Sequence, residues 1–449
     1  MSRRVSRCRV SLGVLLVALL VLAGTAGGTE SVSAGREPAG QEPAWYRGNT
    51  HTHSFRSDGD DFPEMVADWY KAHGYQFLAL SEHDLLMRGE RWRDVYDKDR
   101  PIPAAVIERC RQRFGASWVE TRGEGPKLQV RLKTLDEVRG KLEEPGRFLL
   151  LEAEEITAKC GEAQVHASAI NLAELIEPQE APTVVETLRR NLQAVGRQAD
   201  RLRRPIAAQV NHPSWPRYDV AAEDLAEAVE ARFFEVCNAS EGSNRLGDGQ
   251  HPTVDRLWDI ANTLRIARQK LPPLYGVATD DAHHYQQTGP ERANPGRGWI
   301  MVRARGLTAE ALLEGMSRGD FYASTGVLLK ELSYDLGRGT LVVEVSPQPG
   351  TEYTIEFLGT LAGYDPATEL VPAADKDGKP LRPVRRYSPD VGKILASFRA
   401  TRAVYKLSGN ELYVRAAVRS DRRMPNPPKG EGQFEEAWTQ PVGWAKWVR

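Results

Sequence analysis

The sequence has little cysteine and no excess of either charge. Four cysteines stand far apart in 449 residues, which argues against a disulfide framework and a cysteine-based zinc site. The 60 lysines and arginines nearly balance the 61 aspartates and glutamates, so bulk charge gives no support to nucleic-acid binding. The chain also lacks a Gly-X-Ser-X-Gly motif and a Walker-type phosphate loop. Serine-based hydrolysis and P-loop chemistry therefore have no support.

Long hydrophobic runs are also missing, apart from one near the N-terminus at residues 10–22. That run is shorter than the roughly 20 residues of a membrane-spanning helix. Arginines precede it and small residues follow it, which is the order of a secretory signal peptide. We predict that residues 1–34 are a signal peptide and leader, with cleavage after Ala26 or Ala34, and that residues 35–44 are a flexible linker. The mature protein is then secreted or periplasmic without a membrane span, and an uncleaved anchor is the alternative.

Residues 45–325 have the pattern of an α/β domain. The chain is 41% hydrophobic and 27% charged, as in ordinary globular proteins. Strand-like apolar runs alternate with helical stretches, which is typical of a parallel sheet covered by helices. An arginine-rich insertion at residues 85–147 interrupts this pattern, and the spacing of Thr134 and Glu137 predicts a capped helix near its end. The strand-like runs lie at residues 77–80, 148–151, 205–210, 233–236, 274–278 and 299–302.

The last part of the chain, residues 326–449, has a different pattern. Apolar and polar residues alternate with period two around Tyr353, Ile355 and Phe357, which indicates half-buried strands. Residues 408–410 read Ser-Gly-Asn between two such runs and predict a hairpin there. We therefore expect a small all-β sandwich to follow the α/β domain.

Six of the nine histidines occur in short clusters that follow strand-like runs, together with three carboxylates. In parallel α/β folds, residues at the carboxyl ends of strands converge in space. Buried structural histidines would each need a polar partner to offset desolvation, whereas imidazole and carboxylate groups together suit Zn²⁺, Mn²⁺ or Fe²⁺. The set is too large for one ion and predicts two to three divalent ions. Its members are His51, His53, Asp58, His83, Glu155, His166, His212, Asp281 and His283.

Taken in order, these clusters resemble the polymerase and histidinol phosphatase (PHP) family of metal-dependent phosphoesterases. The resemblance covers residues 46–325. It implies a distorted (β/α)7 barrel with a trinuclear metal site at the carboxyl-terminal mouth of the strands. It also implies that all nine residues are ligands and take part in catalysis. His51 and His53 would bind the first ion, and Glu155 would bridge two ions.

The remaining ligands are assigned by the same resemblance. Asp58 and His83 would bind a further ion, and His166 with His212 would complete a third site. Asp281 and His283 would close the set.

Two positions depart from the family pattern. Glu82 precedes His83 where the family usually has aspartate. Near the bridging glutamate, Ala153 and Glu154 stand where a glycine is usual, which leaves the choice between Glu154 and Glu155 open. In a regular strand these two side chains point to opposite faces.

The metal set and the resemblance together predict a phosphoesterase. A hydroxide that bridges two metal ions would attack the phosphorus of a phosphate ester, in a small-molecule or glycan-linked substrate. One alternative is a metal-dependent hydrolase of an amide or a glycan substituent, because such a hydroxide also attacks carbonyl groups. Another is a non-catalytic surface protein that binds glycan or peptide. We expect no nucleic-acid partner.

Several further polar residues have two possible roles. The arginines of the insertion, with Arg292 and Arg297, could bind phosphate through paired hydrogen bonds or be solvated surface charges. Asn238 could orient a ligand or belong to a turn. His284 could lie behind the metal ligands or on the surface, and His251, in a glycine-rich loop, is expected to be exposed.

Overall fold

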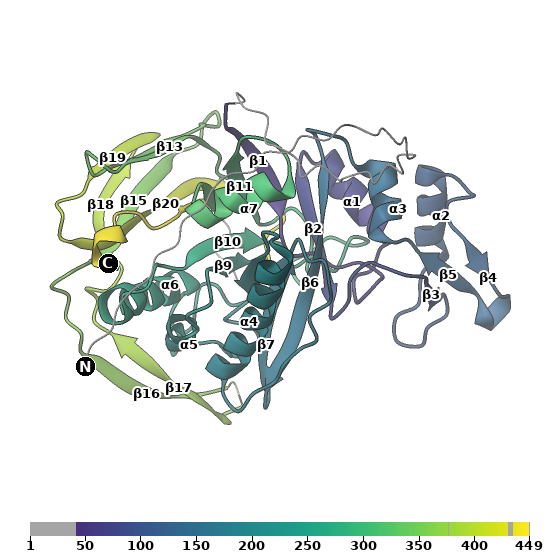
Figure 1. Ribbon diagram of the computed structural model, residues 1–449, viewed down its shortest axis with the longest axis horizontal. Helices are drawn as coiled ribbons and strands as arrows, with labels where there is room; N and C mark the ends of the chain where they lie inside the picture. The colour runs from purple at the N-terminus through teal and green to yellow at the C-terminus, as the bar shows by residue number, and fades with distance from the viewer. Residues whose placement is uncertain (1–41, 376, 430–433, 449) are drawn as a thin grey trace, which may run out of the picture. The chain divides into compact units, whose positions relative to one another are not determined.

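A computed structural model describes residues 42–375, 377–429 and 434–448 of the chain (Figure 1). The predicted signal peptide, the leader and most of the linker lie outside these residues. Among the helices that the structure describes, none is both long and apolar enough to cross a membrane.

The α/β class is confirmed by a large mixed sheet with helices packed against it. The sheet has thirteen strands in the order β10-β9-β8-β7-β6-β2-β1-β11-β12-β21-β20-β15-β18. The strands of its first part are β1 (Ala44–Asn49), β2 (Phe77–His83), β6 (Leu149–Cys160), β7 (Ala163–Ile170), β8 (Ala207–Val210), β9 (Phe233–Asn238), β10 (Tyr275–Thr279), β11 (Trp299–Ala304) and β12 (Phe321–Ser324).

The helices of this part bury apolar faces against the sheet. Thr183, Thr253 and Thr308 each accept a hydrogen bond from a backbone N–H in the first turn of the helix that follows, and so satisfy groups that the helix itself leaves free. In the longest of these helices, Leu188 and Leu192 face the core. The helices are α1 (Pro63–Ala72), α4 (Val184–Leu202), α5 (Ala222–Glu227), α6 (Val254–Thr263), the π-helix η2 (Leu264–Gln269) and α7 (Ala309–Arg318).

The sheet is not wholly parallel, contrary to the pattern expected from the sequence. β1, β2 and β6 are parallel neighbours, as are β8, β9 and β10. β7 runs antiparallel to both β6 and β8, because a short turn after Cys160 sends the chain straight back along β6. Beyond the strand ends, an isolated bridge joins Thr52 to Ala282. It brings the segment after β1 beside the segment after β10.

The insertion forms a small layer of its own. Its apolar side chains, among them Val106, Cys110 and Val130, share a core with α1. The predicted capping box of Thr134 and Glu137 is confirmed. Figure 1 shows this layer at one end of the view, and its elements are β3 (Arg91–Asp94), α2 (Ala104–Phe114), β4 (Thr121–Arg122), η1 (Gly125–Lys127), β5 (Gln129–Leu132) and α3 (Leu135–Leu142).

The C-terminal part consists almost entirely of strands. β15, β18, β20 and β21 extend the large sheet, β13, β14 and β19 form a second sheet, and β16 pairs with β17. The predicted boundary between residues 325 and 326 stays a prediction, since the large sheet continues across it through β12 and β21. The strands are β13 (Leu329–Asp335), β14 (Thr340–Val345), β15 (Tyr353–Leu361), β16 (Thr368–Ala374), β17 (Pro380–Tyr387), β18 (Lys393–Arg399), β19 (Arg402–Lys406), β20 (Glu411–Arg423) and β21 (Phe434–Thr439), followed by the 3-10 helix η3 (Ala445–Trp447).

The hairpin predicted at residues 408–410 is wrong. The strand before it, β19, pairs with β14, and the strand after it, β20, pairs with β15 and β21. The connection therefore passes from one sheet to the other. Glu411 accepts backbone hydrogen bonds from Ser408 and Gly409, so its carboxylate fixes the turn that the sequence had suggested.

A buried ion pair joins the C-terminal strands to α6. Arg415 on β20 is 0% exposed and Asp259 on α6 is 2% exposed. The Nε and Nη2 atoms of Arg415 donate to the two carboxylate oxygens of Asp259 at 2.9 and 2.7 Å. Tyr413 donates to the same carboxylate at 2.7 Å. Such a two-point contact fixes the orientation of both side chains.

Candidate metal centre

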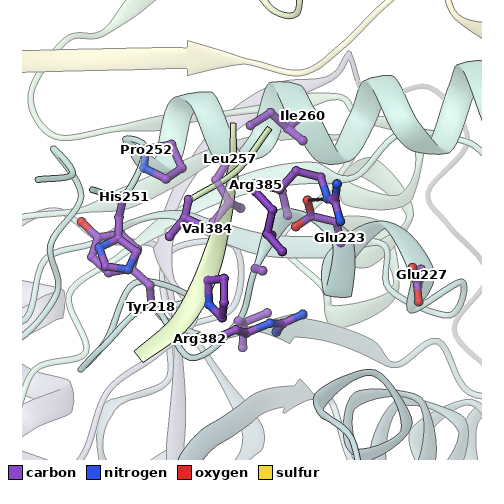
Figure 2. Close-up of a pocket in the computed structure, with 15 residues that line it drawn as sticks. Tyr218, Glu223, Glu227, His251, Pro252, Leu257, Ile260, Arg382, Val384 and Arg385 are labelled. Atoms are coloured by element: carbon purple, nitrogen blue, oxygen red, sulfur yellow. Dashed lines mark ion pairs between the residues drawn. The ribbon is translucent and has the colours of Figure 1, made fainter. Parts of the chain in front are cut away.

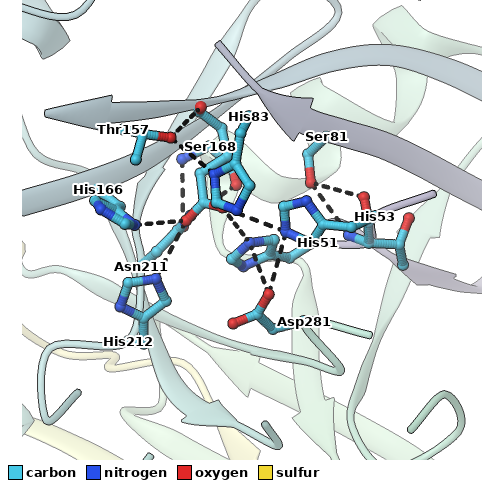
Figure 3. Close-up of polar contacts among 12 residues, drawn as sticks. His51, His53, Ser81, His83, Thr157, His166, Ser168, Asn211, His212 and Asp281 are labelled. Carbon is cyan, nitrogen blue, oxygen red and sulfur yellow. Dashed lines mark hydrogen bonds and ion pairs between the residues drawn. The ribbon is translucent and has the colours of Figure 1, made fainter. Parts of the chain in front are cut away.

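The structure brings together all nine residues predicted as metal ligands. They fall into three adjoining groups, and within each group the potential ligand atoms lie within 4.8 Å of one another. His53 and Glu155 each belong to two groups. Figure 3 shows most of these side chains converging from different strands. The groups are His51, His53, Glu155 and Asp281; His53, Asp58, His83 and His283; and Glu155, His166 and His212.

The first group surrounds one point between β1, β6 and β10. The Nε2 atoms of His51 and His53 each lie 3.2 Å from Asp281 Oδ1. The same two atoms lie 3.2 and 3.3 Å from Glu155 Oε2. All four side chains are buried. Four potential ligands thus converge on one another.

Asp58 and Glu155 are the carboxylates of the other two groups. The Asp58 carboxylate lies 3.2 Å from His283 Nε2 and 3.4 Å from His83 Nε2. On the other side, Glu155 Oε1 lies 3.2 Å from His166 Nδ1 and 3.1 Å from His212 Nε2. His166 reaches the centre from within β7 rather than from the end of a parallel strand.

The register of β6 decides between the two candidate glutamates. Glu155 is 1% exposed and points into the centre. Glu154 points to the other face, where one of its carboxylate oxygens accepts the backbone N–H of Ile176 at 3.0 Å. Burial raises the pKa of Glu154 to about 8. The structure therefore brings Glu155, and not Glu154, beside the other candidate ligands.

Glu235 is a central residue of the site that the sequence analysis missed. It is 0% exposed, and its Oε1 lies 2.7 Å from His51 Nδ1. With the Nδ1 proton shared with Glu235, the ring presents the lone pair of Nε2 to the centre. The only signal in the sequence is a single carboxylate within the apolar run 233–237. Further donors to its two oxygens are Thr279 Oγ1, Gln209 Nε2, the backbone N–H of His212 and Asn238 Nδ2.

Other hydrogen bonds fix the orientation of the remaining ligands. His83 Nδ1 lies 2.8 Å from Thr157 Oγ1, which itself donates to the backbone carbonyl of Glu155 at 3.1 Å. His283 Nδ1 lies 2.8 Å from the carbonyl of Asp281. In both rings, the proton on Nδ1 leaves Nε2 free to face the centre.

Asn211 and Asn238 hold the carboxylates of the centre in the same way. Asn211 Nδ2 donates to Glu155 Oε1 at 2.8 Å, and Asn238 Nδ2 donates to Asp281 Oδ2 at 3.1 Å. Asn238 therefore orients a candidate ligand, one of its two predicted roles.

Glu82, which departs from the family pattern, supports the loop that carries Asp58. Its carboxylate is fully buried and accepts the backbone N–H groups of Ser54 and Ser57, both at 3.1 Å. The hydroxyl groups of both serines donate to it as well. Glu82 thus shapes the loop after β1 instead of facing the metal centre.

The electrostatics of the centre favour an added positive charge. Burial alone would lower the pKa of His53, but the neighbouring carboxylates of Asp281 and Glu155 raise it to about 10. Despite burial, nearby imidazoles hold the pKa of Asp58, Glu155 and Asp281 well below the usual carboxylate range. The carboxylates therefore stay ionised and draw protons onto buried imidazoles. A divalent cation would take the place of those protons.

Unpaired buried atoms also fit a metal. His51 Nε2, His53 Nε2 and Asp281 Oδ1 are buried, and each lacks a hydrogen-bond partner of good geometry among the described residues. Buried polar atoms without partners are rare because they lose their hydration. The three atoms belong to one group of potential ligands. The donor set of imidazole and carboxylate suits Zn²⁺, Mn²⁺ or Fe²⁺.

The centre opens into a pocket of about 330 Å³. Trp215, Arg100, Glu241 and His284 contribute to its walls. His284 Nδ1 accepts the backbone N–H of Ala293 at 3.1 Å, so in the neutral ring the proton lies on Nε2. His284 therefore lies at the rim, beside the candidate ligands.

Arg297 takes no part in this pocket, contrary to one of its two predicted roles. It is 1% exposed and donates to the backbone carbonyls of Asn426 and Gly289, both at 2.7 Å. It is a structural residue and not a solvated surface charge.

A separate pocket of about 390 Å³ lies beneath the β16–β17 hairpin (Figure 2). Its walls are largely apolar, with Val384, Leu257 and Ile260 among them. His251 faces Tyr218 with the ring centroids 4.0 Å apart and is 7% exposed, so the prediction that it is exposed is wrong. None of the three groups of potential metal ligands in the described residues lies there.

Solved structures that are similar to the chain include two at low identity. One, from Bacteroides vulgatus, is a two-domain protein described as containing a predicted PHP-like metal-dependent phosphoesterase. It is 13% identical and covers 92% of this chain and 100% of its own, with a TM-score of 0.38. The other, from Bifidobacterium adolescentis, is described as a candidate metal-dependent phosphoesterase. It is 14% identical and covers 54% of this chain and 89% of its own, with a TM-score of 0.30.

Both descriptions name the kind of protein that the motifs resemble. No protein-family model matches the chain, and no curated protein is significantly similar to it.

Proposed function

We propose that the protein is a metal-dependent phosphoesterase that hydrolyses a phosphate ester at a multinuclear centre. The observation that carries the proposal is the sharing of His53 and Glu155 between groups of potential ligands. Shared ligands place ions close together, as two-metal hydrolysis requires. A complete ligand set favours an enzyme over a binding protein with a structural site.

We infer that two to three ions, Zn²⁺, Mn²⁺ or Fe²⁺, are held by the nine candidate ligands. Ions bound there supply a Lewis acid and lower the pKa of coordinated water towards neutrality. The protein's own part is to hold the ligands in register. Glu235 and Thr157 fix the tautomers of His51 and His83, and Asn211 fixes the carboxylate of Glu155.

The pocket around the centre supports a phosphate ester more than an amide. Arg100 lines it together with the candidate ligands, and a guanidinium group matches the geometry of phosphoryl oxygens. His284 presents an N–H at the rim, where it can hydrogen-bond substrate. The pocket is open at this end, which suits a small molecule or a phosphate on a larger glycan.

We also infer that the strands around the centre form the distorted barrel that the family resemblance implies. β1, β2, β6, β7, β8, β9 and β10 follow one another in the sheet. The bridge between Thr52 and Ala282 supports closure between the first and the last of them. A closed ring directs the ends of its strands to one mouth.

The test is hydrolysis by the protein from about residue 35, loaded with Mn²⁺, Zn²⁺ or Fe²⁺ and with its metal content measured. The substrates are p-nitrophenyl phosphate and bis-p-nitrophenyl phosphate, a monoester and a diester. We expect turnover of one of them and its loss in Asp281→Asn, together with loss of bound metal and with an unchanged circular dichroism spectrum. A fully loaded protein that hydrolyses neither ester would contradict the proposal and favour an amide or glycan substituent.

A further inference from the structure

A third pocket, of about 450 Å³, adjoins the pocket of the metal centre. The two share Asp58, Arg100, His283 and His284 in their walls. The two pockets therefore lie side by side, and most of the candidate ligands line the pocket of the metal centre. The third pocket is lined by Arg93 and Arg292, among others.

Three arginines of this pocket lack a carboxylate partner. Arg93 donates to the backbone carbonyls of Phe55 and Arg100, at 3.1 and 3.0 Å. Arg100 reaches only the carbonyl of Ser57, at 3.5 Å, and Arg292 reaches the side chain of Gln287, at 3.3 Å. None of the three forms an ion pair with a carboxylate of the described residues.

Neighbouring arginines of the insertion behave differently. Arg88 forms an ion pair with Glu152 at 2.6 Å, and Arg131 forms one with Glu137 at 2.8 Å. The absence of a carboxylate partner is thus not shared by every arginine of the insertion, and the pocket gathers three arginines that lack one.

The electrostatics of the cluster favour a bound anion. Arg93 is half-buried, and burial together with repulsion from Arg100 lowers the pKa of its guanidinium group. Its contacts to backbone carbonyls hold the side chain in place without an ion pair. An anion in the pocket would relieve the repulsion between Arg93 and Arg100, and the guanidinium groups that line the pocket could donate charge-assisted hydrogen bonds to it.

We propose that this arginine cluster binds a second anionic group of the substrate, a phosphate or a carboxylate, while the ester to be cleaved lies at the metal centre. The inference rests on the proposed function and names the class of its substrates: phosphate esters with a second negative group. It also gives the insertion a role, because Arg93 and Arg100 both belong to it.

The test compares three esters of similar size on the metal-loaded protein. Glycerol 1-phosphate has no second anion, 3-phosphoglycerate has a carboxylate, and glycerol 1,3-bisphosphate has a second phosphate. We expect kcat/KM to be at least about tenfold higher for one or both of the last two, as one charge-assisted hydrogen bond allows. Their ranking separates carboxylate from phosphate recognition.

Two variants locate the preference. Arg292→Gln alters an exposed side chain, and Arg93→Gln alters a half-buried side chain. Both residues line the third pocket and not the pocket of the metal centre. Each should reduce the ratio of kcat/KM values between the two-anion ester and glycerol 1-phosphate at least about fivefold, mainly through KM. The matched control is Arg91→Gln. Arg91 is an exposed arginine on β3, the strand that carries Arg93, and lies outside the pocket lining. This variant should leave the ratio of kcat/KM values unchanged.

Three results would overturn the inference. They are equal kcat/KM for all three esters, an unchanged ratio in Arg93→Gln and Arg292→Gln, and an equal loss on all three esters in these variants. Calorimetric binding of glycerol 1,3-bisphosphate and glycerol 1-phosphate separates this inference from the proposed function. If the loaded protein hydrolyses no ester, binding still tests the arginine cluster. Tighter binding of glycerol 1,3-bisphosphate than of glycerol 1-phosphate, reduced in Arg292→Gln, would support the cluster. Equal binding of the two compounds would refute it.

Discussion

Replacement of Glu235 by glutamine tests whether a carboxylate behind the ligands controls the metal centre. Glu235 Oε1 faces His51 Nδ1 and the hydroxyl of Thr279, at 2.7 and 2.6 Å. Its Oε2 accepts from the backbone N–H of His212 and from Asn238 Nδ2, at 2.6 and 2.8 Å. Every one of these groups is placed to donate. In either orientation, the glutamine amide would therefore turn its own NH2 group towards donors.

The size of the effect follows from that mismatch. Loss of a carboxylate that supports a ligating histidine typically costs 10- to 100-fold in metal affinity, or about 1.4 to 2.8 kcal/mol. We expect Glu235→Gln to weaken metal binding by about that factor. The metal-free protein should lose about 1 to 3 kcal/mol of unfolding free energy, because buried donors lose their acceptor.

The assay is competition for Zn²⁺ or Mn²⁺ against a chromogenic chelator, with urea unfolding of the metal-free protein alongside. The matched control is Glu152→Gln, a change of the same kind on β6. The carboxylate of Glu152 pairs with Arg88 at 2.6 Å and lies outside the three ligand groups. Glu152→Gln should therefore leave metal affinity unchanged. If Glu235→Gln bound metal as tightly as the wild type, the reasoning that the Glu235 carboxylate orients His51 would be refuted.

The other predictions concern the ligands and the fold. Glu155→Gln should lose bound metal and activity. Glu154→Gln should retain both, because the carboxylate of Glu154 faces the backbone of Ile176. Measurement of bound metal tests this prediction, and equal losses in both variants would contradict the register of β6. Removal of metal by dipicolinate should abolish activity reversibly, and metal at 100 times its dissociation constant should stabilise the fold by about 2.7 kcal/mol; activity that persists with metal shown to be absent would exclude the mechanism. Arg415→Met should cost about 3 to 5 kcal/mol in urea unfolding at pH 7, since it leaves the buried Asp259 without its ionic partner and with only the Tyr413 hydroxyl as a side-chain donor. A change below about 1 kcal/mol would contradict the expectation that this buried pair stabilises the fold.

Much of the site could be read from the order of a few residues. Histidine and carboxylate clusters after apolar runs were enough to nominate His51, His53 and Asp281, because chemistry limits which side chains bind divalent ions. The structure brings all nine nominated residues into contact. Alternation of strands and helices likewise indicated the α/β class, since each pattern repeats within a few residues of the chain.

Other features depended on partners that are distant in sequence. Nothing local shows that β7 turns back antiparallel to β6, or that residues 408–410 connect two different sheets. Glu235 looked like one carboxylate in a buried strand until His51, 184 residues away, lay against it. The unpaired state of Arg93 and Arg292 is also a tertiary property, because any nearby carboxylate could have neutralised them.

The sequence alone determined which residues could bind metal and where several strands of the α/β part would lie, because both follow from side-chain chemistry and short-range periodicity. Only the tertiary structure decided which face of β6 meets the centre, which carboxylate orients His51 and where positive charge remains unpaired. Those outcomes depend on the pairing of strands and the packing of loops far apart in the chain, which short-range patterns do not encode.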